Sequence, residues 1–118
     1  MSDSILRNLS KDFAKSIVFL SKKITEEKRE FVLSKQLLRS GTSIGANIHE
    51  AQYAQGSLDF ISKFEIALKE CFETDYWLEL LFETGYVDED DYKALNNQCG
   101  RIRKMLISTC NTIKGNIK

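Results

Sequence analysis

The chain has 118 residues, and its 17 lysines and arginines are balanced by 17 aspartates and glutamates, so its formal net charge is zero. A strongly basic domain, the usual signature of nucleic-acid binding, is therefore excluded, although a local basic patch is not. The length suits one domain with a sizeable core, and we expect residues 1–118 to form that domain. The chain contains no proline, which favours long uninterrupted helices.

The cysteines and the N-terminus indicate a cytoplasmic protein. Cys71, Cys99 and Cys110 are odd in number and lack the spacing of metal ligands, so we expect reduced thiols in the core. The first residues, MSDS, lack the basic and apolar regions of a signal peptide. No apolar run approaches the roughly 20 residues that a membrane span needs, so we expect no membrane partner.

The first helix is predicted over residues 3–24. Its core face has the spacing of a helix bundle and comprises Ile5, Leu6, Leu9, Phe13, Ser16, Ile17, Leu20 and Ile24. A basic stripe on the opposite side comprises Arg7, Lys11, Lys15 and Lys22. Val18 and Phe19 lie off the core face, as exposed residues or as contacts to another chain.

A charged connection over residues 25–30 leads into the second helix, predicted over residues 30–54. Thr25 is a candidate cap for the turn that follows, and Gly56 is a candidate left-handed C-cap. Gly41 and Gly45 each cost this helix about 1 kcal/mol relative to alanine, so we expect a close approach to the backbone there. The core face comprises Leu37, Ser40, Gly41, Ile44, Ile48 and Ala51. A polar stripe beside it comprises Gln36, Arg39, Ser43, Asn47 and Glu50.

The third helix is predicted over residues 57–84, and Thr74 and Asp75 share its core face, so both need partners. The apolar members of that face are Phe60, Ile61, Phe64, Ala67, Leu68, Cys71, Leu78, Leu81 and Phe82. A second apolar strip comprises Ile66, Tyr76, Trp77 and Leu80. A monomeric bundle has no use for this strip, which predicts an oligomer interface. The alternative is partial burial under a long side chain or a terminus.

Gly85-Tyr-Val forms the predicted turn into the fourth helix, and Asp88 is its expected N-cap. The acidic residues after Asp88 suit the positive end of a helix, and they lack the alternating ligands and central glycine of a calcium loop. The predicted core face comprises Leu95, Cys99, Ile102, Leu106, Thr109 and Ile113. Arg101 and Lys104 face outward, and the basic tail over residues 114–118 is expected to fray. Four amphipathic helices with short connections predict an all-α, antiparallel up-down-up-down four-helix bundle.

No catalytic residues and no cofactor or metal ligands are predicted. His49 is the only histidine and does not follow a glutamate at the spacing of a di-iron site, so we interpret it as a surface or interface residue. The favoured interpretation of Arg39, Ser43, Asn47 and Glu50 is a structural network along the helix and across to Glu70, Glu73 or Asp75. The alternative is a ligand or nucleic-acid site built from the same residues.

The run QLLRSGTSIGANIHEA over residues 36–51 resembles the four-helix-bundle family of 23S rRNA intervening-sequence proteins, the so-called S23 ribosomal protein family. The segments DFI over residues 59–61, IALKE over residues 66–70 and TDYWLELL over residues 74–81 extend the resemblance to nearly the whole chain. The resemblance implies a bacterial cytoplasmic bundle that forms homo-oligomers, with a pentamer favoured. A similar bundle is the accessory protein of diversity-generating retroelements, which implies nucleic-acid binding through a basic ring surface. The resemblance implies no catalytic residues.

Our first hypothesis is a non-enzymatic homo-oligomer that binds rRNA, another structured nucleic acid or a ribonucleoprotein through basic faces. Contact candidates are Arg7, Lys11, Lys15 and Lys22, followed by Arg101 and Lys104. The alternative is a protein-interaction scaffold without a nucleic-acid role, in which a protein partner supplies the activity.

Overall fold

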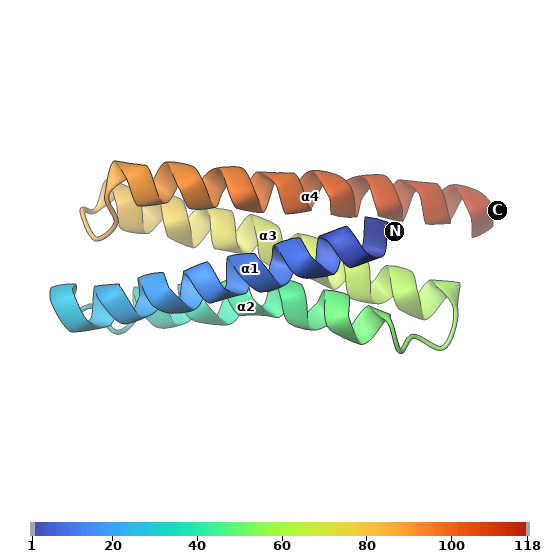
Figure 1. The fold of residues 1–118 in the computed structure, drawn as a ribbon, viewed down its shortest axis with the longest axis horizontal. Helices are drawn as coiled ribbons and strands as arrows, with labels where there is room; N and C mark the ends of the chain where they lie inside the picture. Colours follow the sequence, from blue (N-terminus) through green and yellow to red (C-terminus); the bar gives the residue numbers. More distant parts are fainter. Residues whose placement is uncertain (1, 118) are drawn as a thin grey trace.

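The computed structural model describes residues 2–117 and the side chains of residues 4–116. Its four long helices are α1 (Ser2–Lys23), α2 (Leu33–Ala51), α3 (Ser57–Glu83) and α4 (Glu89–Ile117). Each helix packs on its neighbours in the sequence, and α1 also contacts α4, which closes the antiparallel bundle predicted from the sequence (Figure 1). The start of α1, the α2–α3 loop and the end of α4 lie at one end of a molecule that measures 49 × 21 × 20 Å.

The helical spacing of apolar residues correctly predicted most of the core. Phe13, Ile17, Leu37, Phe64 and Leu106 are among the fully buried side chains, and they come from all four helices. Burying aliphatic and aromatic side chains of this size stabilises the fold by roughly 1.5–3 kcal/mol each. Ile5 was wrongly placed in the core, because it lies in the first turns of α1 and is 51% exposed.

The connection between α1 and α2 differs from the prediction. The first helix continues as a π-helical segment (Ile24–Lys28) and stops at Arg29, whose φ of 56° is left-handed. Thr25 does not cap the next helix, because its hydroxyl donates backwards to the carbonyl of Lys22. The carboxylate of Glu30 instead accepts hydrogen bonds from the backbone N–H groups of Leu33 and Ser34, at 3.0 and 2.9 Å, so α2 begins at Leu33.

The other helix ends are only partly as predicted. Asp88 is the N-cap of α4, as expected, and its Oδ1 accepts the N–H of Asp91 at 2.8 Å. The second helix ends at Ala51, three residues early, and Gly56 lies at the N-cap of α3 with a φ of 146° that side chains rarely adopt. Helix α4 extends to Ile117, so the basic tail expected to fray continues the helix as far as residue 117, and residue 118 lies outside the described residues.

The glycines of α2 mark where α1 crosses it. A Cβ atom at Gly41 would lie 2.9 Å from two carbons of Ile17, and one at Gly45 would lie 3.3 Å from the carbonyl oxygen of Ser10. Both contacts are tighter than ordinary van der Waals contact, which explains why α2 accepts glycine despite its low helix propensity. Hence the close approach predicted from the sequence is made by α1.

Candidate nucleic-acid and assembly surfaces

The outer side of α1 carries the basic stripe, which is defined as Arg7, Lys11, Lys15 and Lys22, all exposed. Arg7, Lys11 and Lys15 are spaced four residues apart. This spacing places like charges next to each other on the helix, which costs about a few tenths of a kcal/mol per pair. Among the described side chains, no carboxylate forms an ion pair with the stripe, and Arg7 donates only to the Ser4 hydroxyl at 3.0 Å. The repulsion is therefore retained along the outside of α1.

Apolar side chains flank the basic stripe. Phe19 is 70% exposed and Val18 is 45% exposed, so both lie off the core as predicted. Lys23 lies on the side of α1 nearer α4, where it pairs with Asp91 at 3.5 Å. The outer side of α1 thus combines unpaired positive charge with an exposed aromatic ring, a combination typical of single-stranded nucleic-acid surfaces.

The other two contact candidates, Arg101 and Lys104, lie on α4. Both side chains are exposed, and neither forms an ion pair within the described residues. They make a second, smaller basic surface on a different helix from the basic stripe.

The outer side of α3 carries a face of exposed apolar side chains. We define the α3 apolar face as Leu58, Ile66, Phe72 and Tyr76. Leu58 and Phe72, which are 74% and 54% exposed, were missing from the sequence prediction. Phe72 precedes Tyr76 by four residues, and that spacing was the signal that could have identified it.

The remaining residues of the predicted interface strip are less exposed. Trp77 and Leu80 are half-buried, and Trp77 packs against the core while its indole N–H donates to Glu73 at 3.1 Å. Tyr76 lies edge-to-face with Trp77, with a centroid distance of 5.0 Å. Trp77 therefore supports the exposed residues from beneath and contributes to the protomer's own stability.

The polar stripe of α2 connects α2 to α3. Arg39 forms ion pairs with Glu70 and Glu73, while the hydroxyl of Ser43 donates to the carbonyl of Arg39. Asn47 donates to the carbonyl of Ser43 at 2.9 Å. The remaining member of the network, Glu50, pairs with Lys63 at 3.0 Å.

Asp75, the third carboxylate considered as a partner for Arg39, pairs with Arg103 of α4 instead. Burial raises the pKa of Asp75, and the Arg103 guanidinium opposes that rise. Thr74, the other polar residue of the α3 core face, donates to the Ser40 hydroxyl at 3.0 Å. Thr74 therefore has the partner that the sequence required, and Asp75 has one through Oδ2, while its buried Oδ1 accepts no hydrogen bond from the described residues.

The cysteines and the histidine do not form a reactive cluster. Cys71, Cys99 and Cys110 are buried free thiols, and Cys99 donates to the Cys71 carbonyl at 3.6 Å. The neighbouring Cys71 thiol, together with burial, raises the pKa of the Cys99 thiol far above its usual range, and a neutral thiol is a poor nucleophile. Among the described residues, no group of three or more His, Cys, Asp or Glu is placed to hold a metal ion.

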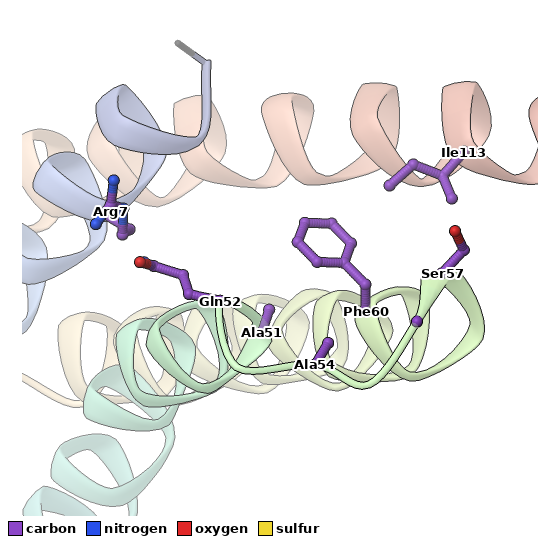
Figure 2. Close-up of a pocket in the computed structure, with 8 residues that line it drawn as sticks. Arg7, Ala51, Gln52, Ala54, Ser57, Phe60 and Ile113 are labelled. Atoms are coloured by element: carbon purple, nitrogen blue, oxygen red, sulfur yellow. The ribbon is translucent and has the colours of Figure 1, made fainter.

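Two hollows have Arg7 in their lining. One is a groove of about 420 Å³ between α1 and α2, and the other is a hollow of about 590 Å³ at the bundle end that holds the α2–α3 loop. Figure 2 shows the end hollow, where Phe60 extends toward Ile113 of α4 and the side chain of Gln52 extends toward Arg7. The sequence did not reveal these hollows, because each depends on residues from separate helices or loops.

The fold and these surfaces define a small antiparallel four-helix bundle with a basic outer side on one helix and an apolar outer side on another. Residues 2–108 match the family described as 23S rRNA-intervening sequence protein, and the chain belongs to this family. The resemblance drawn from the α2 motif is thereby confirmed.

A solved structure supports the same assignment. The chain is similar to a protein of unknown function from the S23 ribosomal protein family of Bacteroides thetaiotaomicron VPI-5482, with 52% sequence identity and a TM-score of 0.92. The match covers 94% of this chain and 99% of that chain. The chain matches no curated protein. No helix within residues 2–117 combines the length and apolar character that crossing a membrane requires.

Proposed function

We propose that this chain is a non-enzymatic, cytoplasmic accessory protein that forms a homo-oligomer and binds structured RNA or a ribonucleoprotein through the basic stripe of α1. The observation that carries the proposal is the stripe itself: four exposed cations on one helix side without a carboxylate partner among the described side chains. Such a surface binds phosphate groups with little sequence specificity.

The α3 apolar face supports self-association. Exposed aromatic and aliphatic side chains on one helix side often mark a protein–protein interface, and aromatic residues contribute disproportionately to binding energy. Assembly through α3 would leave α1 free, because the two helices are diagonal in the bundle. A ring, with a pentamer favoured, would repeat the basic stripe once per protomer and so multiply the avidity of a neutral chain.

A filter-binding titration against structured rRNA fragments tests RNA binding. We expect affinity at low salt that falls steeply as the salt concentration rises, because phosphate contacts release counterions. The absence of binding at low salt would contradict the proposal, as would binding that is insensitive to salt.

The second candidate function is a protein-interaction scaffold without a nucleic-acid role. The extent of the α3 apolar face favours it, since Leu58 and Phe72 enlarge that face beyond the predicted strip. A defined assembly that binds no RNA, and that captures one protein partner only while α3 is unaltered, would favour this alternative.

A further inference from the structure

The lining of the two hollows that meet at Arg7 is free of acidic residues within the described part of the chain. This is unexpected in a protein with equal numbers of acidic and basic residues. Neighbouring carboxylates have other partners: Glu50 pairs with Lys63, and Asp59 accepts the backbone N–H of Gln55 at 3.1 Å. An anion that entered these hollows would therefore meet no lining carboxylate.

The groove between α1 and α2 offers donors suited to a phosphate group. Arg7 and Lys11 line it from α1, His49 lines it from α2, and Asn8 adds an amide. The hydroxyls of Thr42 and Ser10 also lie in the lining, but they already donate to the carbonyls of Leu38 and Arg7. Ala14 and Ala46 are small lining residues that leave room beside these donors, whereas Gly45 lies in close contact with Ser10 of α1.

The end hollow has a mixed lining that suits a flat ring with polar edges. Ala51, Ala54, Phe60 and Ile113 supply apolar lining, while Gln52 and Ser57 supply polar groups (Figure 2). Its volume of about 590 Å³ lies within the roughly 300–1,000 Å³ typical of small-molecule sites. Tyr53 stands nearby, 76% exposed, and lies edge-to-face with His49 at a centroid distance of 5.7 Å.

We propose that the groove and the end hollow together bind one nucleotide unit, with its phosphate between Arg7, Lys11 and His49 and its base in the end hollow. Arg7 lines both spaces and so lies where the phosphate and the base would join. The unit can belong to a single-stranded RNA segment or to a free nucleotide, because both present the same phosphate and base. If the unit belongs to an RNA segment, this proposal rests on the proposed function. It then adds one defined pocket to a basic stripe whose other cations contact phosphates without selecting a base.

The test uses the intact protein, a labelled single-stranded RNA of about six nucleotides, AMP and inorganic phosphate. Fluorescence anisotropy measures RNA binding, and calorimetry measures binding of AMP and of phosphate. Ala46→Leu fills the groove at an exposed helix position without changing charge, and Lys11→Gln removes one groove cation. Lys22→Gln is the matched control, because Lys22 belongs to the basic stripe but does not line either hollow.

We expect Lys11→Gln to weaken binding of the RNA and of AMP about tenfold, the effect of losing roughly one charge-assisted hydrogen bond. Ala46→Leu should weaken both by a similar factor, because its side chain occupies the groove. Lys22→Gln should change AMP affinity less than twofold, because Lys22 lines neither hollow. It should weaken RNA binding less than Lys11→Gln does, because it removes a stripe cation but no contact in the groove. Phosphate alone should bind more weakly than AMP. Thermal unfolding of each variant verifies that it is folded.

The outcomes separate this proposal from the proposed function. If RNA binds but Ala46→Leu has no effect and Lys11→Gln matches Lys22→Gln, the nucleotide site is wrong while RNA binding by the stripe stands. If RNA does not bind but AMP does, with the same sensitivity to Ala46→Leu, the site stands as a free-nucleotide site and the proposed function fails. If neither RNA nor AMP binds, both are wrong.

Discussion

The outer sides of α1 and α3 have opposite chemistry although they belong to the same bundle. The α1 side carries the basic stripe, whereas the α3 side carries the α3 apolar face. Both helices bury their inner sides in the same core, so core packing does not account for this difference. In a chain of zero net charge, overall composition hides both surfaces, and only the assignment of residues to helix sides separates them.

The two helices differ most clearly in whether these charged side chains form ion pairs within the protomer. On α3, Glu70 and Glu73 face α2 and are paired with Arg39. On α1, the four cations of the basic stripe face solvent and have no carboxylate partner among the described side chains, whereas Lys23 pairs with Asp91. Charges that pair within the protomer serve register, while the stripe cations are free for an external anion.

The largest predicted effect comes from reversing charge on α1. We expect the double variant Lys11→Glu/Lys15→Glu to lower affinity for structured RNA by about 100-fold or more at low salt, because two phosphate contacts become repulsive. The control Lys28→Glu/Lys35→Glu makes the same charge change at exposed positions outside the stripe, and it should have a much smaller effect. Filter binding measures both, and equal losses would show that net charge alone determines affinity.

The next effect tests the α3 side. Ile66→Glu/Tyr76→Glu should reduce the assembly to a protomer of 13.6 kDa, because it places two charges in the α3 apolar face. These exposed positions are cleaner probes than Trp77, whose substitution by glutamate would also disturb the core. Light scattering gives the mass and circular dichroism verifies the helices. A folded double variant with unchanged mass would show that another surface drives assembly.

A smaller predicted effect tests whether packing on the inner side of α1 can be altered without altering RNA binding by its outer side. Gly41→Ala should lower the free energy of unfolding by about 1–2 kcal/mol. The new methyl group would overlap buried Ile17, and the cost of that overlap exceeds the gain from the higher helix propensity of alanine. Gly45→Ala should change it by less than about 1 kcal/mol, since its closest contact is longer. Urea unfolding measures both. Gly41→Ala should leave RNA affinity unchanged while folded, and a large loss of affinity would contradict the separation.

The smallest effect concerns Glu30 between the two helices. Partial burial alone would raise its pKa, but the hydrogen bonds from Leu33, Ser34 and Val32 outweigh it, and the pKa is lowered from the ordinary 4.5. The folded state therefore binds this proton more weakly than the unfolded state. The resulting stabilisation is present above pH 4.5 and is lost as the pH falls through the lowered value.

Glu30→Ala should thus cost about 0.5–1 kcal/mol at pH 7, a value at the low end for caps because the carboxylate is partly exposed to solvent. Glu30→Gln keeps an acceptor and should cost less. Unfolding at pH 7 and pH 3 measures the difference. A cost for Glu30→Ala that is equal at both pH values would contradict the capping role.

The sequence predicted more of the fold than of the surfaces. Helical spacing placed Phe13, Ile17 and Leu37 in the core, because burial imposes a period that can be counted. It failed at the π-helical segment and the Glu30 cap, since a carboxylate that accepts from backbone N–H groups three and four residues ahead leaves no periodic signal. The nearest sequence candidate, Thr25, bonds within its own turn instead.

The candidate sites were less predictable for a related reason. The basic stripe lies on one helix and was visible in the sequence, whereas the end hollow requires Arg7, Gln52 and Ile113 from three parts of the chain. Trp77 and Leu80 were assigned to an interface because a helical projection does not show how far neighbouring helices cover a residue. Phe72 was omitted although its exposure makes it part of the α3 apolar face.

The most direct test of the central claim, that α3 assembles the protein while α1 binds RNA, is the mass of the unaltered protein by light scattering with and without a structured rRNA fragment at low salt. We predict a homo-oligomer several times the 13.6 kDa protomer mass, with five protomers favoured, and a further increase of about one RNA mass when the fragment is added. A mass of 13.6 kDa that RNA does not change would contradict both halves of the claim.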